Sequence, residues 1–234
     1  MKIKQSKARI AFNAVNYIIL SLITLTCIFP ILHILAMSLS SSAAAAAGKV
    51  GFWPVDFSLE AYQYLMRKDD FFKSVGISGL RVLVGSVVNM TMLVITAYPL
   101  SKNSINFRWR NVYMVYFAIT MFISGGLIPT YMVLKELNLL DSFWVLILPG
   151  AVSIWNVIIL MNFFRGIPRA LEEAAAMDGA SHWRILFQIF LPMSLPSLAS
   201  LLLFTMIGHW NAWFDGMMYM NTPENYPMAT YLAT

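Results

Sequence analysis

Residues 173–192 read EAAAMDGASHWRILFQIFLP and form a polar interruption in an otherwise very apolar chain. Of the 234 residues, 59% are hydrophobic and only 12% are charged, whereas a soluble domain carries about 25% charged residues. Because so few charges cannot cover a water-facing surface, the composition predicts an all-α membrane protein. A polar stretch between apolar spans then suggests a segment that meets another protein.

Five apolar runs on either side of this stretch are long enough to cross a bilayer, which takes about 20 apolar residues per helix. The runs are continuous and lack the two-residue alternation of strands, so a helical bundle of about five transmembrane helices is expected. Residues 1–13 precede a single membrane domain, residues 14–234. Its predicted spans are 14–38, 76–100, 111–134, 142–164 and 187–210. Gly125 and Gly126 are expected to break the third span or to permit close packing.

The distribution of basic residues predicts the orientation, because Lys and Arg collect on the cytoplasmic side. The segment before the first span and those after the second and fourth spans carry more Lys and Arg than the alternate segments. The N-terminus and the loop at 165–190 are therefore expected in the cytoplasm. Topology also explains the net charge of +5, so no nucleic-acid partner is expected. Asp141 and Asp215 fall at outer boundaries, where solvated side chains are expected.

No motif in the sequence supports catalysis or cofactor binding. There is no phosphate-binding loop, no catalytic triad or zinc-protease motif, and a single cysteine, Cys27. The three histidines fall in separate places and cannot converge on one metal, so we expect neither an enzyme nor a metal site. The spans hold almost no ionisable residues, which disfavours ion-coupled secondary transport.

The polar stretch reads as two short helices joined by a turn. Pro168 suits the first position of the first helix, and Glu172 and Glu173 lie in its first turns, where carboxylates oppose the positive helix end. Gly179 supplies the turn, and a second helix starts near Ser181. Its expected anchors are Trp183, Leu186, Phe187 and Phe190. Acidic and basic residues are balanced, which favours a protein partner over the alternative of a loop lying on the membrane.

The run LEEAAAMDGA followed by Ile189, Leu191 and Pro192 resembles the EAA loop of ABC-importer permeases. Other segments are similar to the carbohydrate-type members of that family, the relatives of the maltose permease. These segments are Pro54 to Tyr62, Ala97 to Ser101, Gly125 to Tyr131, Trp210 to Asp215 and Tyr226-Pro227. The resemblance covers nearly the whole chain from about residue 10. The coupling residues that it implies are Glu173, Ala174, Ala175, Asp178, Gly179, Ile189, Leu191 and Pro192.

The resemblance implies a half-channel of a sugar importer in the bacterial cell membrane. A second, homologous permease would complete the channel, and two ATPase subunits that bind ATP and Mg would dock on the EAA loop. A solute-binding protein would deliver sugar from outside, and transport would proceed by alternating access. Glu173 would offer a charge to the ATPase cleft, and Gly179 would allow the turn.

The chain also departs from the family. The family has six spans, whereas this chain stops at Thr234 before a sixth, so a C-terminally truncated member is expected. A scaffold or regulatory subunit that docks a cytoplasmic partner and transports nothing is the alternative. The sequence identifies neither the sugar nor the residues that line its path.

Overall fold

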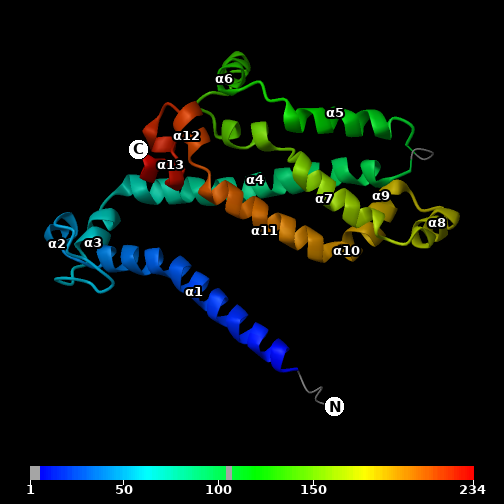
Figure 1. Ribbon diagram of the computed structural model, residues 1–234. Coiled ribbons are helices and arrows are strands. Elements are labelled where there is room, and N and C mark those ends of the chain that lie inside the picture. Colours follow the sequence, from blue (N-terminus) through cyan, green and yellow to red (C-terminus); the bar gives the residue numbers. More distant parts are fainter. Residues whose placement is uncertain (1–5, 104–106) are drawn as a thin grey trace. The chain divides into compact units, whose positions relative to one another are not determined.

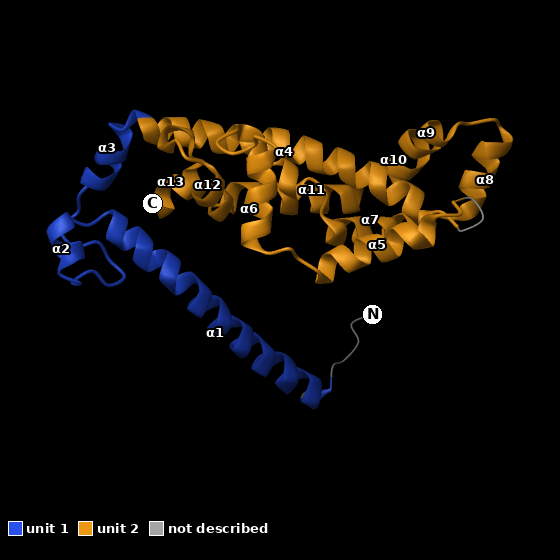
Figure 2. Cartoon of the chain, turned by 90° about the horizontal axis from the view of Figure 1, so that it is seen from above, with its two compact units in different colours: residues 1–69 blue, residues 70–234 orange. Residues whose placement is uncertain are grey.

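A computed structural model describes residues 6–103 and 107–234 of the chain (Figure 1). Every regular element in these two ranges is helical, which confirms the predicted all-α fold class. The chain divides into two compact units, Met1–Asp69 and Asp70–Thr234, which are described separately (Figure 2). Whether residues 14–234 act as one domain stays a prediction.

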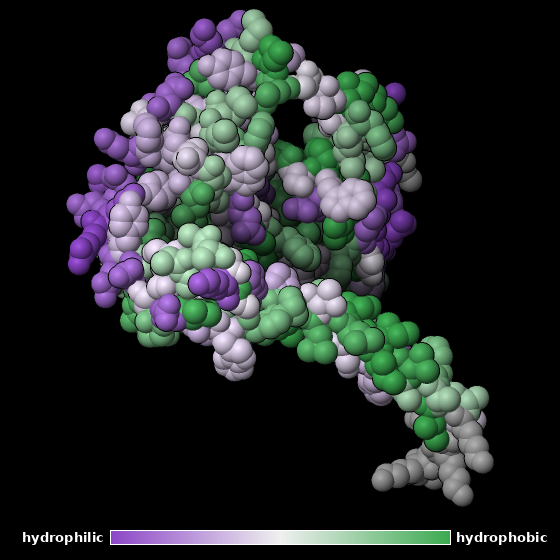
Figure 3. All heavy atoms as spheres, turned by 60° about the vertical axis from the view of Figure 1, so that its left-hand side comes forward, coloured by the Kyte–Doolittle hydropathy of each residue, from purple (hydrophilic) through white to green (hydrophobic). Residues whose placement is uncertain are grey.

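The first unit is dominated by α1 (Lys7–Ser38), which contains the predicted span 14–38. The Ser6 side chain accepts a hydrogen bond from the backbone N–H of Arg9 and so caps the start of the helix. The apolar side chains of α1 are exposed except for Ala36, and the helix is coloured largely as hydrophobic in Figure 3. Such a helix is long and apolar enough to cross a membrane by itself.

Two short helices follow α1 within the first unit. They are α2 (Ser42–Ala46) and α3 (Glu60–Met66). The Ser40 hydroxyl donates to the carbonyl of Ala36 at 2.6 Å and accepts from the N–H of Val55 at 3.0 Å. Ala36 also belongs to a small buried cluster with Ala44 and Val50. The segment after α1 is thereby folded back on the end of that helix.

The second unit is built around α4 (Asp69–Ser101), the other helix long enough to span by itself. It begins seven residues before the predicted span 76–100, because Asp69 and Asp70 are polar yet suit the positive end of a helix. The remaining elements are α5 (Arg110–Phe122), α6 (Leu127–Glu136), η1 (Phe143–Leu146), η2 (Leu148–Gly150), α7 (Ile154–Arg165), α8 (Arg169–Met177), α9 (His182–Ile185), η3 (Leu186–Phe190), α10 (Leu191–Met193), α11 (Leu195–Asn211), α12 (Phe214–Tyr219), η4 (Pro223–Asn225) and α13 (Met228–Ala233).

Three predicted spans are bent pairs rather than single straight helices. The angles are 115° between α5 and α6, 50° between η1–η2 and α7, and 81° between His182–Met193 and α11. At the first break Gly126 has φ of 83°, a conformation that glycine adopts without strain, which confirms the break predicted there. The chain has up to five candidate spans if each bent pair counts as one. The predicted fifth span, 187–210, crosses the 81° bend, with residues 187–193 before it and residues 195–210 in α11.

The main core of the second unit joins α4, α7 and α11 to the segment between α8 and α11. Thirteen buried apolar residues form it, and they include Tyr98, Phe164 and Phe190, whose rings meet edge to face. Ile185 and Leu186, which lie just after α8, are only 2% and 1% exposed. The segment that carries the polar motif is therefore anchored in the core. It lies at one end of the unit, and α12 and α13 lie at the other (Figure 1).

Candidate functional site

The EAA loop (residues 165–190) is a helix, a tight turn and a second helical segment, as predicted. Pro168 is the N-cap of α8 rather than its first helical residue, and its extended ψ of 127° turns the chain out of α7. At the other end Gly179 has φ of 74°. The N–H of Gly179 donates to the carbonyl of Ala176, and that of Ala180 to the carbonyl of Ala175. This pair of bonds is the Schellman ending, which depends on a left-handed residue at this position.

The second segment runs through α9, the π-helical η3 and α10. The Ser181 side chain caps it by accepting a hydrogen bond from the N–H of Arg184. Two of the expected anchors, Leu186 and Phe190, are buried in the core. The other two, Trp183 and Phe187, are each 59% exposed and stack on one another. Two of the four expected anchors therefore pack within the chain, and an anchoring role of the outward-facing pair stays a prediction.

The coupling residues implied by the resemblance divide between two surfaces. Ala175, Ile189 and Leu191 are partly buried against the core. The others are exposed: Glu173, Ala174, Asp178, Gly179 and Pro192. Met177, the last residue of α8, is 88% exposed. The outward face of α8 thus combines a carboxylate, small alanines and a flexible apolar side chain, which a cleft in another protein could receive.

Glu172 and Lys102 link α8 to the end of α4. The Lys102 Nζ donates to the Glu172 Oε1 at 2.7 Å, and the Lys102 side chain is only 8% exposed. The same ammonium lies 4.1 Å from the ring centre of Tyr98 and 4.0 Å from that of Phe190. Burial lowers the pKa of Lys102, and the hydrogen bond and charge of Glu172 oppose this shift. The Glu172 carboxylate and the two rings together offset the desolvation cost of burying the Lys102 ammonium.

Next to this ion pair lies a cavity of about 550 Å³ with a basic lining. Arg110 and Arg165, which line it, both donate to the carbonyl of Leu100 at the end of α4. Cations suit that position because the last carbonyls of a helix carry partial negative charge. The basic residues that predicted a cytoplasmic side therefore also cap a membrane helix.

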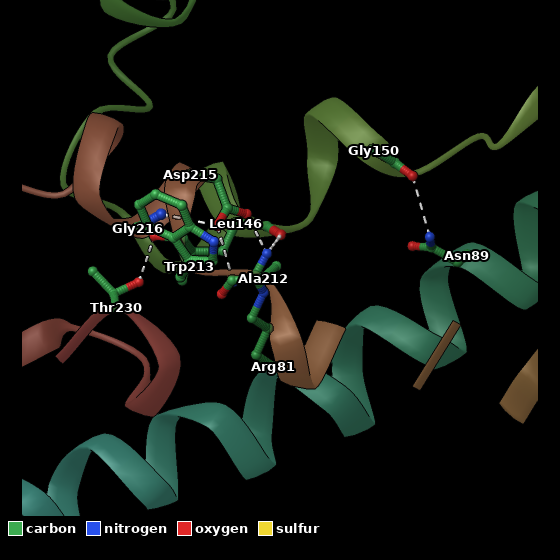
Figure 4. A network of polar contacts seen from close by, with 9 residues as sticks. All are labelled: Arg81, Asn89, Leu146, Gly150, Ala212, Trp213, Asp215, Gly216 and Thr230. Atoms are coloured by element: carbon green, nitrogen blue, oxygen red, sulfur yellow. Dashed lines mark hydrogen bonds and ion pairs between the residues drawn. The ribbon is translucent and has the colours of Figure 1, made fainter. Parts of the chain in front are cut away.

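A second polar network lies at the opposite end of the second unit (Figure 4). Arg81 of α4 is 2% exposed and forms an ion pair with Asp215, and its other bonds go to the carbonyls of Leu146 and Ala212. The prediction of a solvated Asp215 is therefore wrong. A buried guanidinium needs an opposite charge, and the fold supplies it from α12, far along the chain.

Asp141 is not a simple solvated residue either. Its carboxylate accepts hydrogen bonds from the N–H groups of Asn221 and Thr222 and from the Thr222 hydroxyl. The hydroxyl and N–H of Thr222 hold the pKa of Asp141 below its usual value. Asp141 itself has φ of 57°, a left-handed conformation that Asp tolerates better than most residues. This aspartate joins the turn before η1 to the segment after α12.

A cavity of about 380 Å³ lies beside the Arg81 network, lined from α4, α7, α11 and the η1–η2 segment. Three buried atoms of its lining residues have no hydrogen-bond partner among the residues that the structure describes: Arg81 Nε, Asn89 Oδ1 and His209 Nε2. Each of these atoms has less than 1 Å² of exposed area, and the His209 ring lies against Gly85 of α4, so the atoms are enclosed by the packing around the cavity.

Residue types that bind metals do not come together in the described part of the chain. Among residues 6–103 and 107–234 no three His, Cys, Asp or Glu side chains could hold one ion.

Sequence reasoning missed Lys102 and Arg81 as parts of these networks. In the sequence, Lys102 contributed only to the number of basic residues that predicts the orientation of the spans. Arg81 gave a usable signal, because an arginine twelve residues inside a long apolar helix is costly without a partner. Nothing in the sequence pattern identified Asp215 as that partner.

Comparison with known proteins gives consistent matches. The family model described as "Binding-protein-dependent transport system inner membrane component" matches residues 92–223. A permease protein of Bacillus subtilis (strain 168), YtcP of the polygalacturonan/rhamnogalacturonan transport system, is 38% identical over 94% of this chain and 77% of its own length. Protein LplC of the same bacterium is 37% identical over 97% of this chain and 76% of its own length.

Among solved structures, one chain of a bacterial ABC transporter "involved in the import of the acidic polysaccharide alginate" matches with a TM-score of 0.90. It is 32% identical, and the match covers 99% of this chain and 82% of that one. The similarity thus extends from sequence to the arrangement of the helices.

Proposed function

This chain belongs to the family of binding-protein-dependent transport system inner membrane components, and from that premise we propose how it works within an importer. It is a membrane-spanning permease subunit of an ABC importer for sugars or oligosaccharides, and it is not an enzyme. The function predicted from the EAA loop is thereby confirmed. The scaffold alternative is not favoured.

The observation that carries the mechanism is the exposed face of α8, held on a loop whose other face is buried in the core. We propose that this face, with Glu173 and Met177, enters a cleft of a separate ATPase subunit. Gly179 would set the direction in which α8 projects. Since the core holds Ile185 and Leu186, a force applied to the loop would reach the membrane helices directly.

The importer would contain further subunits. A second, homologous permease would complete the pathway, and an ATPase dimer would bind ATP and Mg. An extracytoplasmic solute-binding protein would deliver the sugar, as the family description implies. In this arrangement the N-terminus and the EAA loop lie in the cytoplasm, which agrees with the basic residues around them.

Alternating access follows from this arrangement. Closure of the ATPase dimer on ATP would move the EAA loop, and the bundle would rotate from inward-open to outward-open as a rigid body. The free energy of ATP binding in one subunit would thus drive a conformational change in another.

The substrate class proposed first is an oligosaccharide rich in uronic acids. Two similar proteins carry names that point to acidic polysaccharides, polygalacturonan in one case and alginate in the other. The cavity beside α4 is a candidate contact for sugar hydroxyls, because the polar side chains of Asn89, Asn156 and His209 line it. Replacing Asn89 with Ala should then raise the substrate concentration that half-saturates uptake.

The test is uptake by cells that lack the gene, with the wild-type gene returned on a plasmid as the control. The panel should contain oligogalacturonate, alginate oligosaccharide and maltodextrin. We expect growth on or uptake of one acidic saccharide to be lost and then restored. The tagged chain should copurify with a second permease and an ATPase.

A deletion strain with unchanged uptake of every saccharide, together with a tagged chain that retains no ATPase, would favour the scaffold alternative. Loss of maltodextrin uptake alone would keep the transport function and overturn the acidic substrate class.

A further inference from the structure

Lys102 occupies the point where three segments of the EAA region meet. It follows α4 directly, its ammonium pairs with Glu172 on α8, and the Phe190 ring of η3 covers it. We propose that Lys102 is a positioning residue that locks α8 to α4, so that any displacement of the EAA loop is transmitted to this membrane helix. The inference rests on the proposed function and adds to it a residue outside the EAA motif.

The need for such a lock follows from how α8 is connected. Gly166, Ile167 and Pro168 separate it from α7, and Gly179 follows its C-terminal end. These connections fix the two ends of the helix, and Gly179 sets the direction of its C-terminal end, but none of them joins α8 to α4. Ala175 packs against the core, but its small side chain offers little resistance to sliding. The ion pair supplies a directional contact that these features lack.

The low exposure of the Lys102–Glu172 ion pair strengthens it. Lys102 and Glu172 side chains are 8% and 21% exposed, so water screens their attraction poorly. Separating Lys102 from Glu172 would leave a buried charge without a partner. This cost disfavours any state in which α8 moves relative to α4. Among the described residues, the other polar contact between α8 and the end of α4 runs from Arg169 to Asn103, and it is exposed and correspondingly weaker.

The rings of Tyr98 and Phe190 connect Lys102 to the second helical segment as well. Tyr98 and Phe190 contact each other edge to face at 5.2 Å, and each presents a ring to the ammonium. Phe190 ends η3, a π-helical turn, and such turns reposition side chains relative to a regular α-helix and are frequent at functional sites. The Tyr98 hydroxyl has no partner among the described residues, so the ring makes the contact here. One cation therefore holds α4, α8 and η3 together.

The test uses the complete importer in proteoliposomes, with saccharide uptake and ATP hydrolysis measured on the same preparation. Lys102→Met and Glu172→Gln should leave ATPase copurification intact and lower uptake per ATP by roughly 5- to 100-fold, the range of typical coupling energies. Lys102→Arg should stay near wild type, since arginine also pairs with carboxylates and stacks on rings.

The matched control is Lys73→Met. Lys73 pairs with Asp70 at 3.8 Å on the same helix, but its side chain is 58% exposed, so no change in uptake per ATP is expected.

Wild-type uptake per ATP in Lys102→Met or Glu172→Gln would overturn the inference. If Lys102→Met fails to assemble, the nearly isosteric Glu172→Gln decides, and failure of both to assemble would assign the pair to folding instead. These outcomes differ from failure of the proposed function, in which the wild-type complex itself would not import any saccharide.

Discussion

Gly179 shows how one residue can direct a docking helix. A side chain at this position would meet no atom within 4 Å, so space does not exclude it. The backbone conformation disfavours it instead, because Gly179 has φ of 74° and a left-handed backbone costs a residue with a Cβ about 1–2 kcal/mol. The turn after α8 therefore requires glycine for its backbone conformation and not for lack of space.

We expect Gly179→Val to destabilise the end of α8 by about that amount and to reduce uptake. Gly179→Asn is the matched control, since Asn is also found at left-handed helix ends. Uptake and the unfolding temperature of the purified importer measure the effect. Equal behaviour of the Val and Asn variants would contradict the backbone explanation and favour a steric one.

Asp141 predicts a dependence of stability on pH. Its hydrogen bonds favour the charged form, so its pKa in the folded chain lies below the unfolded value of about 4. Its contribution to stability is therefore complete above about pH 4 and is lost as the pH falls through the lower, folded pKa.

Asp141→Asn should accordingly have a lower unfolding temperature than wild type near neutral pH, with the difference shrinking under acid conditions. Unfolding followed from pH 7 down to about pH 3 in detergent tests this, because that range brackets the unfolded pKa. A constant difference across the range would show that the charge of Asp141 is not involved.

At the scale of elements, sequence reasoning worked where one feature decides the outcome. The end of α8 at Gly179 and the break before α6 at Gly126 could be predicted because left-handed φ favours glycine. The start of α11 at Leu195 could not be predicted in this way. Residues 187–193 are largely apolar, and hydropathy does not reveal that the chain bends by 81° between them and α11.

The outward face of α8 gives a prediction for the element as a whole. In a chain with Cys27→Ser, which removes the only cysteine, Met177→Cys should crosslink to the ATPase subunit. The reason is that Met177 is 88% exposed on the proposed docking face. Trp53→Cys, at an equally exposed residue of the segment predicted outside, is the control and should not crosslink. Crosslinking of both, or of Trp53→Cys alone, would contradict the orientation.

At the scale of the whole molecule, long-range polar pairs are what the sequence could not show. Composition and apolar runs were enough for a helical membrane bundle, and the EAA motif was enough for the family. Lys102 with Glu172 and Arg81 with Asp215 are separated by 70 and 134 residues. Which charges meet over such distances depends on packing of the bundle, and the local pattern carries no information on it.

The Arg81–Asp215 pair is expected to be a main support of the second unit. Arg81→Met should cost about 3–5 kcal/mol, because it leaves a carboxylate without its buried partner. The double variant R81M/D215M should cost less than Arg81→Met, since apolar replacement of both partners leaves no stranded charge. Thermal unfolding in detergent measures both, with Lys73→Met as a surface control expected to lose no more than about 1 kcal/mol. A double variant at least as unstable as the single one would contradict this.

The same pair also has a consequence for synthesis of the protein. Arg81 leaves the ribosome 134 residues before Asp215, which at about 5–20 residues per second is on the order of ten seconds. For that interval α4 carries a cation without its carboxylate partner, placed near the outer end of the predicted span, where a long side chain can reach the interface. The Arg81 guanidinium therefore stays hydrated until Asp215 replaces that water, and mutations of Asp215 should be seen first as a failure of α12 to pack on α4, after α4 has inserted.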